Sequence, residues 1–250
     1  MRLLLSGSEI ATLNERFELA SPQEVVRWAL EDSGIERIAL ASAFQAEGTC
    51  VMHMASLIRP DIEVLFLETG FHFAETLAFK EQMADRLGVT VTDLVGAYTV
   101  ERQTAEFGER LYERDATLCC EVNKVRPMFE ALQKLDAWVT AFRRDSSPTR
   151  ANAPILDLYE LEPGRPMLKI NPVANWSRTD TLGYLSEHDL PHNPLYDLGY
   201  TSIGCAPCTR TRFEGEPERA GRWAGLSKWE CGIHQREAAT QAGLAAEPPA

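Results

Sequence analysis

The sequence has 250 residues, of which 44% are hydrophobic, 8% aromatic and 25% charged, and this composition excludes a fibrous or wholly disordered chain. Against 37 acidic residues, the 25 Lys and Arg leave a formal net charge of −12. No broad basic face remains to neutralise a phosphate backbone, so we expect no nucleic acid partner. An anionic ligand must therefore be bound by a local group of basic side chains.

The sequence does not indicate a membrane-spanning or exported chain. No run reaches the roughly 18 apolar residues that a membrane helix needs. The apolar start of the chain is interrupted at Ser6-Gly7-Ser8-Glu9, before a signal-peptide core can form. We therefore expect a cytoplasmic protein without a membrane partner. In that reducing compartment the six cysteines favour metal binding or redox chemistry over structural disulfides.

Short apolar runs alternate with helical patterns through the first part of the chain. Ser21-Pro22-Gln23-Glu24 combines an N-cap, a helix-starting Pro and a Glu able to close a capping box, which predicts a helix start. This alternation predicts an α/β fold, with a parallel sheet, helices on both of its faces and ligands at the carboxyl ends of its strands. Strands are expected at 37–41, 64–67, 89–91 and 137–142, and helices at about 51–58, 73–87 and 119–132.

The pattern changes after Pro154. Two apolar runs at 155–161 and 167–173 flank Pro163-Gly164 and predict paired strands, and Ser177 begins a helix that extends to about Glu187. Residues 235–250 are rich in Ala, Glu and Gln and contain too little apolar surface to pack, which predicts a flexible tail.

Four of the six cysteines form a pattern that suits a metal centre. Cys119 and Cys120 are adjacent, and Cys205 and Cys208 follow in a Cys-x-x-Cys turn. Four thiolates without a histidine suit either a structural zinc ion or a [4Fe-4S] cluster. Adjacent residues of a helix point about 100° apart, which fits a single ion poorly but can serve two irons of a cluster. A redox-active dithiol at the Cys-x-x-Cys turn is a third interpretation.

The remaining two cysteines differ from each other. Cys50 falls on the apolar face of its helix and is interpreted as part of the core. Cys231 lies outside any periodic segment, just before the tail, where it is either an incidental surface thiol or a nucleophile on a movable arm. Basic side chains upstream of it form either a solvated loop or a site for an anion. They are Arg210, Arg212, Arg219, Arg222 and Lys228.

Together these motifs resemble those of the assimilatory adenylyl-sulfate reductases, which act on 5′-adenylylsulfate (APS) or its 3′-phosphorylated form (PAPS). The string ECGIH at 230–234 is similar to the family's nucleophile motif, and CC followed by CxxC is similar to the signature of members with a [4Fe-4S] cluster, which usually use APS. The loop at 42–48 resembles the family's S-S-F-G-A-E-D, with Ala, Gln and Gly replacing its second Ser, its Gly and its Asp. The strings VTAFRRDSSPTRA, INPVANWSRTD and ERAGRW are similar to motifs around the substrate.

The resemblance covers about residues 20–235 and implies an adenine-nucleotide alpha-hydrolase-like fold. It implies one reductase domain at 1–234, with a nucleotide-binding core at about 20–200 and a cluster and catalytic segment at about 201–234. In this interpretation Cys231 is the nucleophile on a mobile segment, and the cluster ligands are Cys119, Cys120, Cys205 and Cys208. The residues implied in substrate binding are Ser42, Lys124, Arg143, Arg144, Arg219, Arg222 and His234.

The activity that the resemblance implies is the thioredoxin-dependent reduction of APS to sulfite and AMP in assimilatory sulfate reduction, through an S-sulfonate on Cys231. Thioredoxin or glutaredoxin would supply the thiols, and the family's frequent oligomers make a homo-oligomer a further expectation. Two alternatives remain. One is a PAPS reductase that keeps the cluster, and the other is a non-catalytic iron-sulfur redox sensor.

Overall fold

The structure, a computed structural model, describes residues 5–162 and 164–234. The expected flexible tail at 235–250 lies outside the described residues. In the part of the chain that the structure describes, no helix is both long and apolar enough to cross a membrane.

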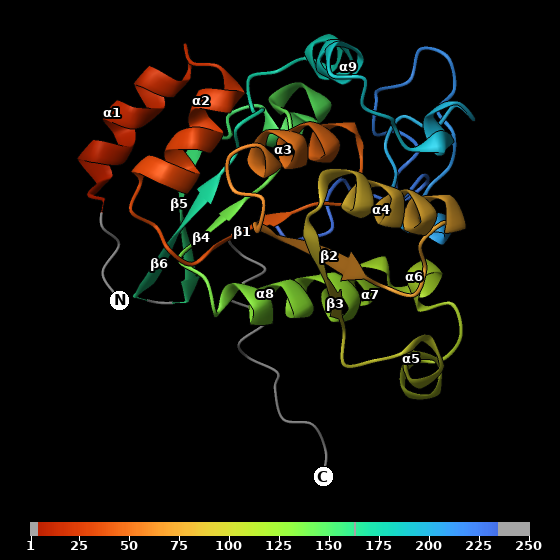
Figure 1. Ribbon diagram of the computed structural model, residues 1–250. Helices are drawn as coiled ribbons and strands as arrows, with labels where there is room; N and C mark the ends of the chain where they lie inside the picture. The colour runs from red at the N-terminus through yellow and green to blue at the C-terminus, as the bar shows by residue number, and fades with distance from the viewer. Residues whose placement is uncertain (1–4, 163, 235–250) are drawn as a thin grey trace.

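Within the described residues, six strands form one sheet whose order is β3-β2-β1-β4-β6-β5 (Figure 1). The strands are β1 (Ile38–Ala41), β2 (Glu63–Glu68), β3 (Thr90–Val95), β4 (Ala137–Val139), β5 (Leu156–Glu162) and β6 (Arg165–Ile170). All neighbouring strands pair in parallel except β5, which is antiparallel to β6. The chain runs outward from β1 to β3 and then returns to place β4 on the other side of β1. The strand order thus reverses between β1 and β4, and such a position is where open α/β sheets bind ligands.

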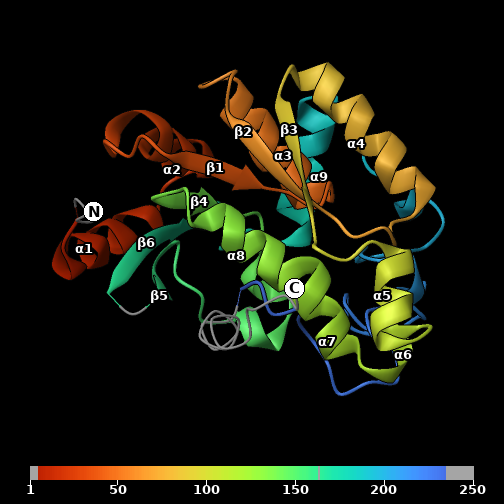
Figure 2. The ribbon, with the colours of Figure 1, turned by 90° about the horizontal axis from the view of Figure 1, so that it is seen from below.

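Helices cover both faces of the sheet, as the views in Figures 1 and 2 show. Leu40 and Val139 point to a core that includes residues of α2, α3 and α9, whereas the alternate residues Ala39 and Trp138 point to a core under α8. The expected α/β sheet with helices on both faces is confirmed. The helices are α1 (Gly7–Phe17), α2 (Pro22–Arg27), α3 (Ala46–Ser56), α4 (Ala74–Leu87), α5 (Val100–Phe107), α6 (Leu111–Arg114), α7 (Ala116–Cys120), α8 (Arg126–Leu132) and α9 (Arg178–Glu187).

Several boundaries differ from the sequence-based expectation, and two of these differences lie at the site. The strand expected at 137–142 ends at Val139, where the chain leaves the sheet and enters the site. The single helix expected at 119–132 is α7 and α8 joined by a π-helical turn, Glu121–Val125, which follows directly on Cys119 and Cys120. π-Helical turns inside helices frequently occur at functional sites.

Candidate functional site

A cavity of about 160 Å³ opens at the carboxyl ends of β1 and β4. Residues 41–43, which follow β1, and residues 140–142, which follow β4, form one part of its wall. The other part comes from segments at 203–204, 219–223 and 230–234. The reversal in strand order therefore brings the C-terminal segment to the edge of the sheet at which a ligand is expected.

The loop between β1 and α3 forms the floor of this cavity. Ser42 is buried, lines the cavity and accepts a hydrogen bond from the Phe44 amide at 3.1 Å. A Cβ on Gly48 would lie 2.4 Å from the Ser42 Oγ, so a glycine at this position leaves room for the Ser42 side chain. The Gln45 side chain accepts a hydrogen bond from the Ile203 amide at 2.8 Å and ties the loop to the opposite wall.

The four cysteines of the CC and CxxC motifs line one small hollow beside the cavity. Among the residues that the structure describes, no three His, Cys, Asp or Glu side chains are grouped to hold a single metal ion. Asn123 donates hydrogen bonds to the carbonyl oxygen of Cys119 at 2.9 Å and to its Sγ at 3.5 Å, and the Thr69 hydroxyl lies 3.3 Å from the Cys205 Sγ. The two cysteine motifs are far apart in sequence, but they meet in one pocket in which Asn123 and Thr69 contact cysteine sulfur atoms.

Lys124 belongs to the walls of both the hollow and the cavity. It lies in the π-helical turn between α7 and α8, one helical turn after Cys120. Burial raises the pKa of Cys119 to about 11 and that of Cys120 to about 12. Burial alone would also raise the pKa of Cys205, but the Lys124 ammonium, the Thr69 hydroxyl and the Arg222 guanidinium together outweigh it and lower the thiol pKa. Lys124 therefore links the charge of the cysteine pocket to that of the cavity.

Arg219 and Arg222 are buried in the cavity wall. Arg219 donates to the Ser202 hydroxyl at 3.3 Å and to the Trp229 carbonyl at 2.9 Å, and Arg222 donates to the Ile203 carbonyl at 3.1 Å. The Nε atom of each guanidinium is buried without a hydrogen-bond partner. Burial, together with the neighbouring arginines, lowers the pKa of Arg219 to about 10. Two guanidiniums in the wall of one cavity can form a site for an anion.

Cys231 lines the cavity, and its neighbours hold the segment around it in place. Cys231 is half-buried and packs against the apolar cluster of Ala116, Cys120 and Trp223. The His234 ring stacks on Trp138 of β4, with centroids 5.5 Å apart and planes at 18°. The expectation placed Cys231 and His234 near the substrate, and the structure brings both to the cavity. Whether this segment moves stays a prediction.

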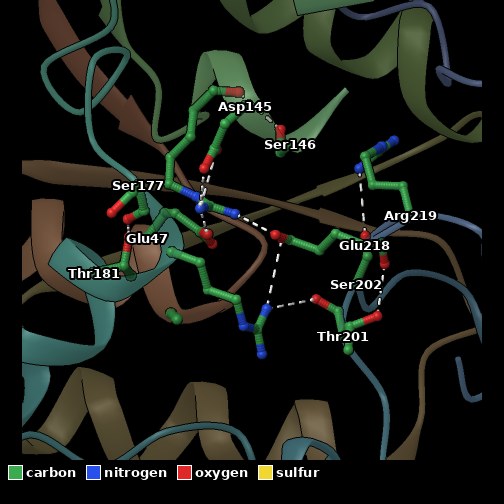
Figure 3. A network of polar contacts seen from close by, with 12 residues as sticks. Glu47, Asp145, Ser146, Ser177, Thr181, Thr201, Ser202, Glu218 and Arg219 are labelled. Carbon is green, nitrogen blue, oxygen red and sulfur yellow. Dashed lines mark hydrogen bonds and ion pairs between the residues drawn. The ribbon is translucent and has the colours of Figure 1, made fainter. Parts of the chain in front are cut away.

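Arg143 and Arg144 take positions that differ from the expectation. The Arg143 guanidinium is fully buried and pairs with Glu47 at 2.8 Å, Asp145 at 3.0 Å and Glu218 at 2.5 Å. Figure 3 shows the side chains of Glu47, Asp145 and Glu218 in one network of polar contacts. Arg144 pairs with Glu18 and donates to the Ala153 carbonyl at 2.7 Å. Neither arginine is among the described residues that line the cavity, and carboxylates and a carbonyl accept hydrogen bonds from both.

Arg150 and Glu230 are cavity residues that the sequence reasoning missed. They form a paired contact in which Arg150 Nε and Nη2 each lie 2.7 Å from a Glu230 carboxylate oxygen. Arg150 belongs to the quoted string VTAFRRDSSPTRA, but the sequence carries no signal that the third arginine of this string, rather than the first two, reaches the cavity. Glu230 is the first residue of the ECGIH string, but the sequence analysis assigned it no role.

The family of the chain follows from comparison with known proteins. The family model described as "Phosphoadenosine phosphosulfate reductase domain" matches residues 37–211. The chain belongs to this family. The resemblance drawn from the motifs is thereby confirmed, and with it the expectation of an enzyme of this reductase group.

Members of the phosphoadenosine phosphosulfate reductase domain family resemble the chain over most of its length. A protein of Streptomyces coelicolor named adenosine 5′-phosphosulfate reductase is 44% identical over 90% of this chain and 95% of its own. A protein of Gloeobacter violaceus named phosphoadenosine 5′-phosphosulfate reductase is 39% identical over 89% of this chain and 92% of its own.

Solved structures place the fold in the same group. The crystal structure of phosphoadenylyl-sulfate reductase from Candida auris, a phosphate complex, has a TM-score of 0.70 and 26% identity, and covers 83% of this chain and 98% of its own. FMN adenylyltransferase of Candida glabrata, at 14% identity and a TM-score of 0.52 over 91% of this chain and 79% of its own, shares the fold alone. The expected adenine-nucleotide alpha-hydrolase-like architecture is therefore confirmed.

Proposed function

We propose that this chain reduces APS to sulfite and AMP in sulfate assimilation, with Cys231 as the nucleophile. The observation that carries the proposal is that the Cys231 thiol shares one cavity with Lys124, Arg219 and Arg222 at the point where the strand order reverses. Relatives named adenosine 5′-phosphosulfate reductase, which align with about nine tenths of the chain, support APS as the substrate.

The cavity supplies what the charged end of this substrate needs. The guanidiniums of Arg219 and Arg222 and the Lys124 ammonium would bind the phosphosulfate group, and Ser42 in the loop after β1 would lie near the nucleotide. The overall charge of −12 repels anions, so these buried cations must provide the attraction locally. His234, at the end of the 230–234 segment, also lines this cavity.

The reaction begins with attack of the Cys231 thiolate on the sulfur of the sulfo group. A sulfur–sulfur bond forms, and the bond between that sulfur and the oxygen bridging to phosphorus breaks. The electron pair stays on the phosphate oxygen of AMP, whose developing charge is stabilised by the arginines. The enzyme keeps an S-sulfonate on Cys231.

Sulfite is released in a second exchange with a dithiol protein such as thioredoxin or glutaredoxin. One thiolate of the partner attacks the Cys231 Sγ, and sulfite leaves with the bonding electron pair. The second partner thiol then resolves the mixed disulfide, so that the partner is oxidised and the Cys231 thiolate is regenerated. The two electrons that reduce the sulfo group thus come from the partner, which requires the Cys231 segment to open toward it. We expect this chemistry in the cytoplasm, where such thiols are kept reduced.

We also propose that Cys119, Cys120, Cys205 and Cys208 bind a [4Fe-4S] cluster. Their shared hollow offers sulfur ligands supported by hydrogen bonds from Asn123 and Thr69, and its described lining contains no His, Asp or Glu. Bound there, a cluster would join the two cysteine segments and give Lys124 a negatively charged neighbour. The electrons for the reaction come from the dithiol partner.

The test is sulfite release by anaerobically purified protein with reduced thioredoxin, given APS and PAPS separately at the same concentration. We expect strong preference for APS. C231S should abolish sulfite release and leave the iron-sulfur absorbance intact, whereas C205S should lose that absorbance. C50A is the matched control, because Cys50 lies in the core away from the cavity, and it should keep activity and spectrum.

Each other result has a definite meaning. Preference for PAPS would keep the mechanism and overturn the substrate. Sulfite release by C231S would overturn the role of that thiol. Protein that is folded, carries its cluster and releases no sulfite from either nucleotide would overturn the reductase function in favour of a redox sensor.

A further inference from the structure

We infer that Glu230 is a positioning residue, which holds the Cys231 thiol at the cavity through its ion pairs with Arg150 and Arg219. The inference rests on the proposed role of Cys231 as nucleophile. Glu230 precedes Cys231 directly, so the position of its carboxylate limits where the thiol can lie. The contacts of that carboxylate are the basis of the inference.

The Glu230 carboxylate is buried and fully engaged. Arg150 donates from Nε to one carboxylate oxygen and from Nη2 to the other, each at 2.7 Å. Thr149 donates to the first oxygen at 3.1 Å, and Arg219 donates to the second at 3.3 Å. Only 7% of the Glu230 surface is exposed, which is rare for a glutamate unless it is paired in this way. Paired, two-point contacts fix geometry as well as charge.

The arginine that makes the paired contact is itself held in place. A short 3-10 turn, Pro148–Arg150, brings the Arg150 amide to the Ser147 carbonyl at 3.0 Å. The Arg150 guanidinium lies over the Phe142 ring, 5.1 Å from its centroid. Phe142 follows β4 and lines the cavity, so the anchor for Glu230 is built on the edge of the sheet rather than on the C-terminal segment.

The segment is fixed on the other side of Cys231 as well. Ile233 packs against the core under α8, and the His234 ring stacks on Trp138. These contacts are apolar or aromatic, whereas the Glu230 contact is ionic. Cys231 thus lies between an ionic and an aromatic attachment, and Arg219 contributes to both the Glu230 contact and the anion site.

This sharing gives Glu230 a further consequence for the reaction cycle. Arg219 contacts the Glu230 carboxylate and also lines the cavity proposed for the phosphosulfate, so loss of Glu230 leaves the cation available to substrate while it frees the thiol. The position of Cys231 should therefore depend on Glu230 more strongly than substrate affinity does. If Glu230 only stabilised the fold, its replacement would not affect the position of Cys231 more than it affects substrate affinity.

The experiment measures how fast iodoacetamide alkylates Cys231 in the intact chain, followed by mass spectrometry of the peptide that carries it. No turnover is needed, so the result is independent of whether the protein releases sulfite. E230Q should be alkylated at least about tenfold faster than wild type, because removing one partner of a buried ion pair breaks the attachment. E230D, which keeps a carboxylate, should fall between the two.

Two internal comparisons separate release of the segment from general loosening. E216Q breaks a similar paired contact in the preceding loop, where Arg210 lies 2.7 and 2.8 Å from the two carboxylate oxygens of Glu216. In this variant iodoacetamide should alkylate Cys231 at the wild-type rate. Cys50 is fully buried, and its alkylation reports global opening. Equal rates at Cys231 in wild type and E230Q would overturn the inference, as would a rise that Cys50 matches in full.

Where sulfite release is measurable, steady-state kinetics give a second readout. We expect E230Q to lower kcat by about tenfold or more and to change KM for APS by less than about threefold, because the attacking thiol rather than the bound anion loses its position. A variant in which KM rises while kcat is unchanged would show that Glu230 serves substrate binding, and would overturn the positioning role.

Discussion

At the scale of single residues, the position of Arg222 depends on the absence of a side chain next to it. A Cβ on Gly204 would lie 2.2 Å from the Arg222 Nη2, so alanine there must displace the guanidinium from the cavity wall. We expect G204A to raise KM for the substrate by about tenfold, since a hydrogen bond to a charged group contributes about 1.5 to 3 kcal/mol.

The measurement for this prediction is KM together with the melting temperature. G183A is the matched control, because Gly183 is exposed on α9 with nothing within 4 Å of its added Cβ, and alanine stabilises a helix. G183A should keep the wild-type KM. A G204A variant with unchanged KM would contradict the placement of Arg222 in the binding wall.

The arginines show where sequence reasoning reaches its limit at this scale. Arg143, Arg144 and Arg150 lie within eight residues, and their chemistry is the same. Arg143 turns toward three carboxylates, including Glu218, which is distant in sequence, and only Arg150 faces the cavity. Asp145 is a local partner, but the other two carboxylates that attract Arg143, those of Glu47 and Glu218, come from other elements, so the neighbouring sequence does not determine which arginine faces the cavity. Cys231, by contrast, was predicted from a specific motif, ECGIH, whereas Lys124 was predicted only from the resemblance to the family, and both line the cavity.

At the scale of elements, the helix that presents the cysteine pair depends on its N-cap. Asp115 accepts hydrogen bonds from the amides of Thr117 at 3.1 Å and Leu118 at 2.8 Å at the start of α7. We expect D115A to lower the free energy of unfolding by about 1 kcal/mol, and D115N, which keeps an oxygen acceptor, to change it by only a few tenths. Urea titration of the three proteins measures this difference. Equal losses in both variants would show that the charge of Asp115 matters rather than the cap.

The elements themselves were largely predictable because their signals are local. The capping boxes at Ser21 and Ser177 mark the starts of α2 and α9, and Gly88 ends α4 in the left-handed conformation with φ of 64°. A further capping box at Ser6 with Glu9, for which the sequence analysis predicts no helix, begins α1. The π-helical turn was not predicted, although Pro127, the second residue of α8, lacks the amide hydrogen that a continuous helix over 119–132 requires.

At the scale of the whole molecule, the topology rather than any one motif assembles the site. Alternating strands and helices predicted a parallel sheet with ligands at its carboxyl edge, and the cavity lies there. The sequence did not predict that β4 would lie beside β1, which brings Phe142 and Arg150 to the cavity. The C-terminal segment then folds back across the sheet to Trp138, a contact between residues 96 positions apart that no local pattern records.

This long-range contact makes the stability of the molecule depend on pH. Burial, reinforced by the positive charges of Lys169, Arg150 and Arg219, holds the pKa of His234 well below its ordinary value of 6.5. The ring is therefore neutral in the folded protein, whereas in the unfolded chain it gains a proton below about pH 6.5. The stabilisation is complete above that pH and is lost as the pH falls, because the unfolded state then binds more protons.

We expect the free energy of unfolding of the wild type to fall more than that of H234F and H234Q between about pH 8 and about pH 5.5, by about 1 kcal/mol. Urea titrations at both pH values measure the difference, in which the other titrating groups cancel. Both variants should lose the pH dependence, because neither phenylalanine nor glutamine titrates. H234F should better retain the stability at the higher pH, because phenylalanine can still stack on Trp138 and glutamine cannot. If H234F keeps the full wild-type pH dependence, His234 is not the group that titrates, and the attachment of the C-terminal segment to the sheet does not rest on its neutral ring.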